Sequence, residues 1–314
     1  SPFFQLTAGA RQNGIGPSWV RLPWVSRVGY NEPQGTSGYA GEKRSANMKL
    51  AFIGGGAMAE AIIHGVLAAK IASPGDIRVG EPLAERRQVL VQRHGVRTDP
   101  SNLEAARGAD LVLLAVKPQD LPRVYAQLNG HLGPEQAALS IVAGARLSTL
   151  VQGLGHAPVI RVMPNTPAQI GCGMSLWTCT GEVDQRQRGL ARSILSTVGQ
   201  EIHVEDEKYL DMATALSGSG PAYVFLFIEA LIDAGVYIGL PREMARTVAL
   251  QTIYGSTKLV METGKHPAEL KDMVVSPGGT TAEALQVLER CGVPAAFVEA
   301  VSAAYQKSIR LGKE

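Results

Sequence analysis

From Met48 onward, apolar residues alternate between short unbroken runs and stretches with helical spacing. Short apolar runs are typical of buried parallel strands, and helices that cover a sheet lie between such strands in the sequence. The predicted strands are residues 49–53, 77–80, 111–116, 139–142 and 159–162, with 174–177 and 201–204 as later edge strands. The predicted helices between them are residues 60–69, 83–94, 121–128, 147–154 and 184–198. Residues 48–206 are therefore predicted to form a doubly wound α/β sheet.

Residues 207–314 have helical spacing almost to their end, after a short polar link at residues 205–208. Residues 223–238 are apolar on more than one face, and residues 246–261 are also rich in apolar side chains. A helix that is apolar on several sides packs against more than one neighbour, which a domain of about 100 residues achieves alone only with difficulty. We therefore predict an all-α C-terminal domain that forms a homodimer, with a compact monomeric bundle as the alternative.

The first 47 residues differ from the rest, because they mix Gly, Pro, Arg and Trp without a helical or strand period. The Gly and Pro residues prevent the sustained amphipathic helix of a transit peptide. We predict that residues 1–47 are a disordered leader or come from translation upstream of a start at Met48. The predicted domains are thus residues 1–47, 48–206 and 207–314.

The composition describes a globular protein of 314 residues with 45% hydrophobic residues and a formal net charge of +2. A net charge this small does not produce an electrostatic field that attracts nucleic acid. The sequence contains no unbroken apolar run of about 18 residues, so it predicts no membrane-spanning segment. The three cysteines, Cys172, Cys179 and Cys291, fit neither a disulfide framework nor a metal site. We therefore predict free thiols in a reducing compartment, a cytoplasmic location and no bound metal.

The first predicted strand ends in Ile53-Gly-Gly-Gly-Ala-Met-Ala59, which has the G-x-G-x-x-A spacing of a dinucleotide-binding turn. Gly54 permits the tight turn, Gly56 lets the backbone approach a pyrophosphate, and Ala59 allows the helix to pack closely on the strand. The helix N-terminus that follows attracts the phosphates. The motif follows a strand and opens a helix, so it predicts a Rossmann-type domain that binds NAD(H) or NADP(H).

The choice between the two cofactors stays open in the sequence. The second strand ends in Gly80-Glu81-Pro82, and Arg86 and Arg87 follow soon after. An acidic residue at this point can accept a hydrogen bond from the ribose 2′-OH of NAD, whereas a nearby arginine can hold the 2′-phosphate of NADP. The arginines also fit a solvated helix face.

Three further motifs follow later strands, where an open α/β sheet gathers its ligand contacts. They are Ala115-Val-Lys-Pro118, Val142-Ala-Gly144 and Met163-Pro-Asn-Thr-Pro167. Lys117 can lie near ribose or phosphate, although a surface lysine before a helix is the commoner explanation. Asn165 can orient a nicotinamide amide, or it can stabilise the turn between two prolines.

An amide-rich turn, Ser276-Pro-Gly-Gly-Thr-Thr281, lies directly before a predicted helix in the C-terminal half. Gly278 and Gly279 let backbone N–H groups face a small ligand, and Thr280 or Thr281 can cap the helix. The helix N-terminus attracts a carboxylate or phosphate. The sequence thus indicates an anion site here, with a well-capped surface helix as the alternative.

Together the motifs of the chain resemble those of pyrroline-5-carboxylate reductases, which catalyse the last step of proline biosynthesis. The resemblance covers residues 48 to about 312. It rests on Phe52-Ile-Gly-Gly-Gly-Ala-Met58, Ala115-Val-Lys-Pro118, Met163-Pro-Asn-Thr-Pro167, Leu216-Ser-Gly-Ser-Gly-Pro-Ala-Tyr223, His266-Pro267 and, most specifically, Leu270-Lys-Asp-Met-Val-Val-Ser-Pro-Gly-Gly-Thr-Thr281. It implies hydride transfer from NAD(P)H to the imine of 1-pyrroline-5-carboxylate, giving L-proline, by dimers that interleave their helical domains; some members assemble five dimers into a decamer.

The resemblance also implies site residues. Glu207 near the ring nitrogen and the Thr281 hydroxyl at the substrate carboxylate are the predicted catalytic residues. The predicted substrate-binding residues are Glu207, Met273, Ser276, Gly278, Gly279, Thr280 and Thr281. The predicted cofactor-binding residues are Ile53, Gly54, Gly55, Gly56, Ala57, Met58, Gly80, Glu81, Pro82, Asn102, Ala115, Val116, Lys117, Pro118, Val142, Ala143, Gly144 and Asn165. Family members often have a small hydroxylated residue in place of Glu81, which weakens an assignment of NADP, and residues 1–47 have no counterpart.

Two other functions are compatible with a Rossmann-type domain followed by helices. A dehydrogenase of the β-hydroxyacid type would need a catalytic lysine in its helical domain, for which Lys258 and Lys271 are the candidates. A regulatory protein would bind NAD(P) without turnover. Whether a reductase would also accept larger cyclic imino acids is not determined by the sequence.

Overall fold

The computed structural model describes residues 48–312, so the predictions for residues 1–47 lie outside the described residues. The chain divides into two compact units, which we describe separately. The sheet unit takes its described residues from 48–227 and 292–312, and the helical unit comprises Ile228–Cys291. The boundary at residues 227 and 228 falls within a helix, and the helical segments just after residue 207 belong to the sheet unit. The predicted functional division at residue 206 stays a prediction.

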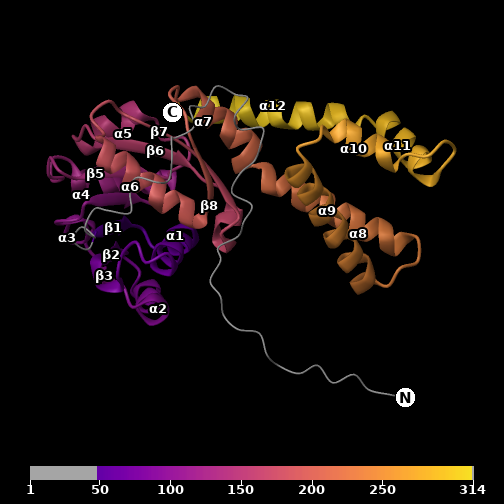
Figure 1. The fold of residues 1–314 in the computed structure, drawn as a ribbon. Helices are drawn as coiled ribbons and strands as arrows, with labels where there is room; N and C mark the ends of the chain where they lie inside the picture. Colours follow the sequence, from indigo (N-terminus) through magenta and orange to yellow (C-terminus); the bar gives the residue numbers. More distant parts are fainter. Residues whose placement is uncertain (1–47, 313–314) are drawn as a thin grey trace, which may run out of the picture. The chain divides into compact units, whose positions relative to one another are not determined.

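The sheet unit contains one sheet of eight strands in the order β3-β2-β1-β4-β5-β6-β7-β8 (Figure 1). Neighbouring strands are parallel except for the antiparallel pair β6–β7, which confirms the doubly wound α/β fold. The strands are β1 (Leu50–Ile53), β2 (Ile77–Gly80), β3 (Arg97–Asp99), β4 (Leu111–Leu114), β5 (Ala137–Ser140), β6 (Val159–Met163), β7 (Gly173–Cys179) and β8 (Gly199–His203).

Helices cover both faces of this sheet, and strand residues alternate between the two cores. Leu50 and Phe52 of β1 face one core, which includes residues of α1, α2 and α6. Ala51 and Ile53 face the other, which includes residues of α3, α4 and α5. The helices of this part are α1 (Ala57–Ala68), α2 (Ala84–His94), α3 (Asn102–Ala106), α4 (Leu121–Leu128), α5 (Leu147–Leu154) and α6 (Gln185–Leu195), with short 3-10 turns η2 (Pro74–Asp76), η3 (Pro118–Asp120), η4 (Thr166–Ile170) and η5 (Ser196–Val198).

Two strand predictions need correction. The sequence analysis missed β3, because its Arg-Thr-Asp sequence has no apolar run. The prediction that residues 174–177 form an edge strand was wrong, since β7 lies between β6 and β8. Trp177 in the middle of β7 is only 1% exposed. The alternation of apolar and polar residues in β7 is typical of a half-covered strand, and it does not reveal that β8 adds to its far edge.

The C-terminal half is helical, as predicted. Helix α7 (Lys208–Ala213) continues through a π-helical turn, η6 (Thr214–Gly218), toward α8. The Ser219 N–H donates to the Thr214 carbonyl at 2.8 Å, five residues back. Pro221 explains this wider turn, because a proline cannot donate to the carbonyl four residues earlier and its ring crowds that carbonyl. The remaining helices are α8 (Gly220–Tyr237), α9 (Arg242–Thr263), α10 (Pro267–Val274), α11 (Thr280–Arg290) and α12 (Val293–Leu311).

Helix α12 returns to the sheet unit, where it contacts α7 and η6 (Figure 1). The Ser308 side chain of α12 is buried and donates a hydrogen bond to Asp211 Oδ1 in α7 at 3.3 Å. The end of α12 also approaches the sheet, because a Cβ added to Gly144 would lie 3.5 Å from that of Leu311. The last helix of the chain therefore completes the unit that begins at β1.

The apolar side chains of α8 are not covered by the described residues of the chain. None of its described residues is buried, and Leu226 is 68% exposed. By length and composition alone, the helical stretch Lys208–Tyr237 is apolar enough to cross a membrane. The sequence analysis did not predict this, because the stretch contains polar residues that interrupt any long apolar run. One such helix is weak evidence for a membrane, because a core helix of a globular protein meets the same test.

Candidate functional site

The carboxyl ends of β1 and β4 form the point at which the strand order reverses, where open α/β sheets bind their ligands. Gly54 follows β1 with φ of +95°, and an added Cβ would lie 2.9 Å from the Ala115 carbonyl oxygen after β4. Gly54 therefore has the conformation and the close contact that only glycine tolerates. Its N–H donates to the Gly80 carbonyl at 2.8 Å, which joins the ends of β1 and β2.

The start of α1 offers the space that a pyrophosphate needs. Gly56 is the N-cap of α1, and among the described residues no heavy atom of another part of the chain lies within 4 Å of the position of an added Cβ. Within residues 48–312, no side chain caps this helix, so the amide groups of its first turn remain available to an anion. Gly55 has a different role, since an added Cβ would lie 2.6 Å from Leu90 Cδ1 of α2. These residues fit a dinucleotide.

Glu81 stands directly after β2, and its carboxylate is held from two sides. Glu81 Oε2 accepts a hydrogen bond from the Gly55 N–H at 3.0 Å, and Oε1 accepts one from the Leu83 N–H at 2.9 Å. Glu81 is 8% exposed. The side chain thus links the glycine-rich turn to the start of α2 and is fixed at the end of β2, where the adenosine ribose of a bound dinucleotide is recognised.

The two arginines after Glu81 are engaged with the protein itself. The guanidinium of Arg86 donates to the Gly55 carbonyl and forms an ion pair with Glu60 of α1. Arg87 Nη1 donates to the carbonyl oxygens of Glu81 and Pro82, both at 2.8 Å. Both side chains therefore stabilise the loop between β2 and α2.

The contacts of Glu60 should make the free energy of unfolding depend on pH. Burial alone would raise the pKa of its carboxyl, but hydrogen bonds from Arg86 and His94 lower the pKa from 4.5 to about 2. A folded-state pKa below the unfolded value stabilises the protein above about pH 4.5 and loses this effect as the pH falls toward 2. The free energy of unfolding of the native protein should therefore exceed that of Glu60→Gln above pH 4.5, with the difference shrinking at lower pH.

Urea unfolding at a series of pH values measures this difference. Glu85→Gln is the matched control, because Glu85 is an exposed residue in the first turn of α2. That variant should show no comparable pH-dependent difference from the native protein. A Glu60→Gln difference that stays constant from neutral to acidic pH would contradict the assignment.

The remaining predicted cofactor residues lie on loops at the same edge of the sheet. Ala115 to Pro118 follow β4, with Lys117 exposed at the start of η3, and Val142 to Gly144 follow β5. Asn102 is buried at the start of α3, and its Nδ2 donates to Gln127 at 2.7 Å. An added Cβ on Gly80 would lie 2.5 Å from Asn102 Oδ1, so Asn102 also explains why glycine ends β2.

Asn165 has both ends of its amide engaged. Asn165 Oδ1 accepts from the Met174 N–H at 2.8 Å, and Nδ2 donates to Ser217 Oγ in η6 at 3.2 Å. These bonds correspond to the turn-stabilising role considered for this residue, and they connect the loop after β6 to the π-helical turn. A contact between Asn165 and nicotinamide stays a prediction.

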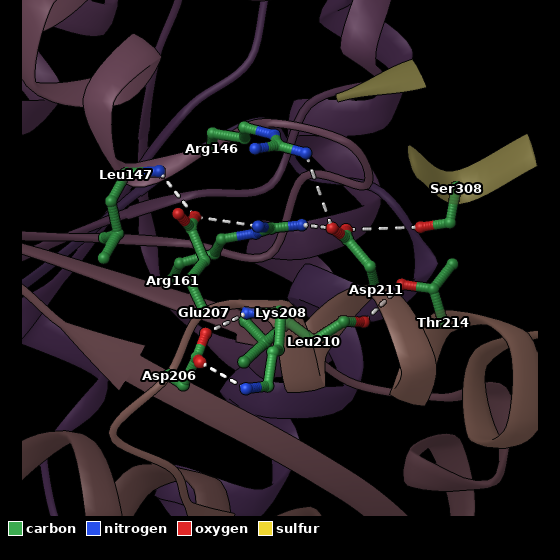
Figure 2. Close-up of polar contacts among 10 residues, drawn as sticks. All are labelled: Arg146, Leu147, Arg161, Asp206, Glu207, Lys208, Leu210, Asp211, Thr214 and Ser308. Carbon is green, nitrogen blue, oxygen red and sulfur yellow. Dashed lines mark hydrogen bonds and ion pairs between the residues drawn. The ribbon is translucent and has the colours of Figure 1, made fainter. Parts of the chain in front are cut away.

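Glu207 lies in a charge cluster that the sequence analysis did not identify (Figure 2). Arg161 in β6 is 3% exposed and donates to Glu207 Oε1 at 2.7 Å and to Asp211 Oδ1 at 3.2 Å. Glu207 Oε1 also accepts from the Leu147 N–H at 2.7 Å, and Arg146 forms a longer ion pair of 3.7 Å with Asp211. Among the described residues, none donates to Glu207 Oε2, so this oxygen can accept a hydrogen bond from a ligand.

One signal in the sequence points to this cluster. Arg161 occupies the centre of the otherwise apolar strand Val-Ile-Arg-Val-Met, and a buried arginine needs an acidic partner. The sequence does not identify that partner, because Glu207 and Asp211 lie 46 and 50 residues further along the chain.

The predicted anion turn lies in the helical unit, between α10 and α11. Gly278 has φ of +68°, and the Gly279 N–H donates to the Ser276 carbonyl at 3.0 Å. The predicted cap by Thr280 or Thr281 is wrong: Gly279 is the N-cap of α11, and no side chain caps this helix in the described chain. Both threonines instead begin the helix. Their amide groups are therefore available to an anion.

The other candidate residues of the helical unit lie on exposed surface. Met273 in the last turn of α10 is exposed, near the anion turn in the sequence. Lys258 forms an i,i+4 ion pair of 3.5 Å with Glu262 on α9, and Lys271 is exposed on α10. No observation favours either lysine as a catalytic residue. Residues 48–312 contain no group of three or more His, Cys, Asp or Glu side chains arranged to hold a metal ion.

Both halves of the chain match models of known protein families. The family model for pyrroline-5-carboxylate reductase dimerisation matches residues 207–311, and the model for coenzyme F420-dependent NADP oxidoreductases matches residues 49–144. Pyrroline-5-carboxylate reductase of Synechocystis sp. is 47% identical over 268 residues, covering 85% of this chain and 100% of its own length. That of Escherichia coli is 41% identical over 266 residues, covering 84% and 98%.

Solved structures agree with these relatives. The structure of a pyrroline-5-carboxylate reductase from Coxiella burnetii has a TM-score of 0.79 at 35% identity and covers 86% of this chain and 100% of its own. The pyrroline carboxylate reductase of Plasmodium falciparum, solved with NADP bound, has a TM-score of 0.78 at 35% identity, with 85% and 98% covered.

Proposed function

The chain belongs to the pyrroline-5-carboxylate reductase family, and on this premise we propose how its residues share the reaction. The protein is an NAD(P)H-dependent oxidoreductase of proline biosynthesis. Its acceptor is the cyclic imine of 1-pyrroline-5-carboxylate: the imine carbon gains a hydride, the ring nitrogen keeps or gains a proton, and the C=N bond becomes the CH–NH bond of L-proline. Rival functions as a β-hydroxyacid dehydrogenase or a non-catalytic NAD(P) sensor lack a supporting observation.

The cofactor would be held by the sheet unit. The uncapped start of α1 would bind the pyrophosphate, the end of β2 would bind the adenosine ribose, and the loops after β4 and β5 would contact the rest of the dinucleotide. The nicotinamide supplies the hydride when the cofactor is bound. The open space at Gly56 and the close contact at Gly54 support this assignment.

The substrate carboxylate would be held by the turn Ser276–Thr281, through backbone N–H groups and the Thr281 hydroxyl. The positive φ of Gly278 and the uncapped start of α11 support this role. An anion bound there would fix the ring in position for reduction, and positioning supplies much of the rate enhancement of such a reaction. A protonated cyclic imine is already electrophilic, so a strongly perturbed acid is not required.

Glu207 would lie near the ring nitrogen, directly or through water, and would favour its cationic form. Its Oε1 is held by Arg161 and the Leu147 N–H, while Oε2 accepts no hydrogen bond from the described residues. This arrangement fixes the carboxylate and leaves one oxygen for the ligand. Arg161 and Asp211 would therefore act as positioning residues.

The observation that carries the proposed function is a relative that is 47% identical over 85% of this chain. Oxidation of NADH and of NADPH should be followed with pyrroline-5-carboxylate and with its six-membered homologue, and reduction of NAD+ and of NADP+ should be followed with β-hydroxyacids. L-proline should be identified by chromatography. We expect proline to form from pyrroline-5-carboxylate. Turnover of β-hydroxyacids with NAD+ or NADP+ but not of pyrroline-5-carboxylate, or cofactor binding without turnover, would contradict the proposal. The six-membered substrate shows whether larger imino acids are accepted.

The protein would act as a homodimer, which in some members of the family is assembled further into a decamer. The match to the family's dimerisation segment and the uncovered apolar side chains of α8 support an oligomer. Light scattering after size exclusion should give at least twice the mass of one chain. The variant Leu226→Glu should shift the protein toward the monomer, because it places a charge in the buried contact.

Ile170→Glu is the matched control for this test, because Ile170 is 79% exposed on η4 of the sheet unit. It should leave the mass unchanged. A native protein that elutes as a monomer throughout the micromolar range would contradict the proposal. A cytoplasmic location stays a prediction.

A further inference from the structure

We propose that this enzyme selects NADH over NADPH and that Glu81 makes the selection by occupying the position where the 2′-phosphate of NADPH would lie. The inference rests on the proposed function only as far as the glycine-rich turn after β1 binds a dinucleotide. It goes beyond that function because the choice of cofactor follows from neither the family nor the reaction. The evidence comes from the contacts of Glu81 and of the two arginines that follow it.

The position of the Glu81 carboxylate is fixed. Its two oxygens accept from N–H groups on different loops, that of Gly55 after β1 and that of Leu83 before α2. The backbone of Glu81 is also fixed, because its N–H donates to the Asp99 carbonyl at the end of β3 at 2.9 Å. A carboxylate held in this way cannot turn aside to make room without losing two hydrogen bonds to a charged group.

The carboxylate still has the capacity to recognise a ribose. An ionised carboxylate has about four lone-pair positions, and the two N–H groups use two of them. The remaining two match the two donors of an unmodified ribose, the 2′-OH and the 3′-OH. A 2′-phosphate has no hydroxyl donor at this position at neutral pH, and it would place up to two negative charges beside the negative charge of the Glu81 carboxylate.

The arginines do not offset this repulsion in the present arrangement. Arg86 is paired with Glu60, whose carboxylate stays ionised at neutral pH because its pKa is about 2. Arg87 uses Nη1 for the carbonyl oxygens of Glu81 and Pro82. These bonds hold each guanidinium against the loop between β2 and α2, so neither can move toward a 2′-phosphate without breaking them.

The Plasmodium falciparum relative was solved with NADP bound, so this scaffold is able to accommodate a 2′-phosphate. The selection we infer therefore belongs to the residues of this chain at the end of β2, and not to the fold. A single substitution at Glu81 should then be sufficient to change the preference.

Direct binding to the full-length enzyme tests the inference without turnover. Dissociation constants for NADH and NADPH, and for their adenosine portions 5′-AMP and adenosine 2′,5′-bisphosphate, should be measured by calorimetry. The native enzyme should bind NADH at least about tenfold more tightly than NADPH, since a hydrogen bond to a charged group is commonly worth a factor of this size. Glu81→Ser should tighten NADPH binding and weaken NADH binding, so that the ratio falls at least about tenfold.

Arg87→Ala serves as the matched control, because it removes a neighbouring charge but neither of the hydrogen bonds to the Glu81 carboxylate. It should leave the ratio of the two dissociation constants unchanged, and thermal unfolding should show that each variant is folded. The inference is overturned if the native enzyme binds the two cofactors equally, if Glu81→Ser leaves the ratio unchanged, or if Arg87→Ala weakens NADPH binding tenfold. No pyrroline-5-carboxylate is present in these measurements, so a failure of the proposed reaction would be seen separately in the turnover assay.

Discussion

Replacing Arg161 by methionine is expected to lower the free energy of unfolding by about 3–5 kcal/mol, the usual cost of removing one partner from a buried ion pair. Arg161 is almost wholly buried, and its guanidinium is shared between Glu207 and Asp211. Without it, the buried carboxylate of Asp211 and the partly exposed carboxylate of Glu207 would have only neutral donors and the more distant Arg146 to balance them. Denaturant unfolding of the native protein and the variant measures the difference.

Arg186→Met is the matched control for this prediction. Arg186 also pairs with an aspartate, Asp110, at 3.4 Å, but Arg186 is exposed to solvent and Asp110 is partly exposed. An exposed pair contributes about 0–1 kcal/mol, so this variant should be nearly as stable as the native protein. Equal losses of unfolding free energy in Arg161→Met and Arg186→Met would show that the buried cluster contributes no more to stability than an exposed ion pair. Arg161→Lys should recover only part of the loss, because a single ammonium cannot match the two-sided geometry of a guanidinium.

The second large effect is expected for Thr281→Ala, which should lower kcat/KM for pyrroline-5-carboxylate by about tenfold or more. A hydrogen bond to a charged group contributes about 1.5–3 kcal/mol, and the proposed role gives the Thr281 hydroxyl one such bond to the substrate carboxylate. Steady-state kinetics with a saturating reduced cofactor measure the effect. An unchanged kcat/KM in Thr281→Ala would contradict the proposed contact between Thr281 and the substrate carboxylate.

Two further variants separate the hydroxyl from other properties of this position. Thr281→Ser keeps the hydroxyl and should retain most of the activity. Thr257→Ala removes a threonine hydroxyl from α9 of the same helical unit, where it donates only to the Ile253 carbonyl, and should leave kcat/KM unchanged. A loss in Thr257→Ala as large as that in Thr281→Ala would indicate a general effect on the helical unit.

The sheet could be predicted from the sequence where strands are buried on both faces. The runs that became β1, β4 and β6 are almost wholly apolar, and a parallel strand between two helical layers needs such a run. Strand β3 lacks it and is held by pairing with β2 at the edge of the sheet. Edge pairing depends on backbone groups, which every residue has, so the sequence carries little signal for it.

The candidate site was predictable where a residue type is required by local geometry. Gly54 and Gly278 have positive φ values in turns that the motifs indicated. The partners of Arg161 were not predictable, because they come from a helix far along the chain. The engagement of Glu81 and Arg86 was also hidden, since their contacts depend on how α1 and α2 lie beside each other. The sequence indicated which groups are present, and the structure shows which of them are already occupied.

The return of α12 to the sheet unit has a consequence for synthesis on the ribosome. The hydrogen bond between Asp211 and Ser308 joins residues 97 positions apart, and the chain between them includes the whole helical unit. The sheet unit therefore cannot be completed until almost the entire chain has emerged. A nascent chain that ends near residue 227 would leave the surface of α7 and η6 without its α12 neighbour. During translation, the interval before α12 arrives is thus the period in which this protein depends most on protection from aggregation.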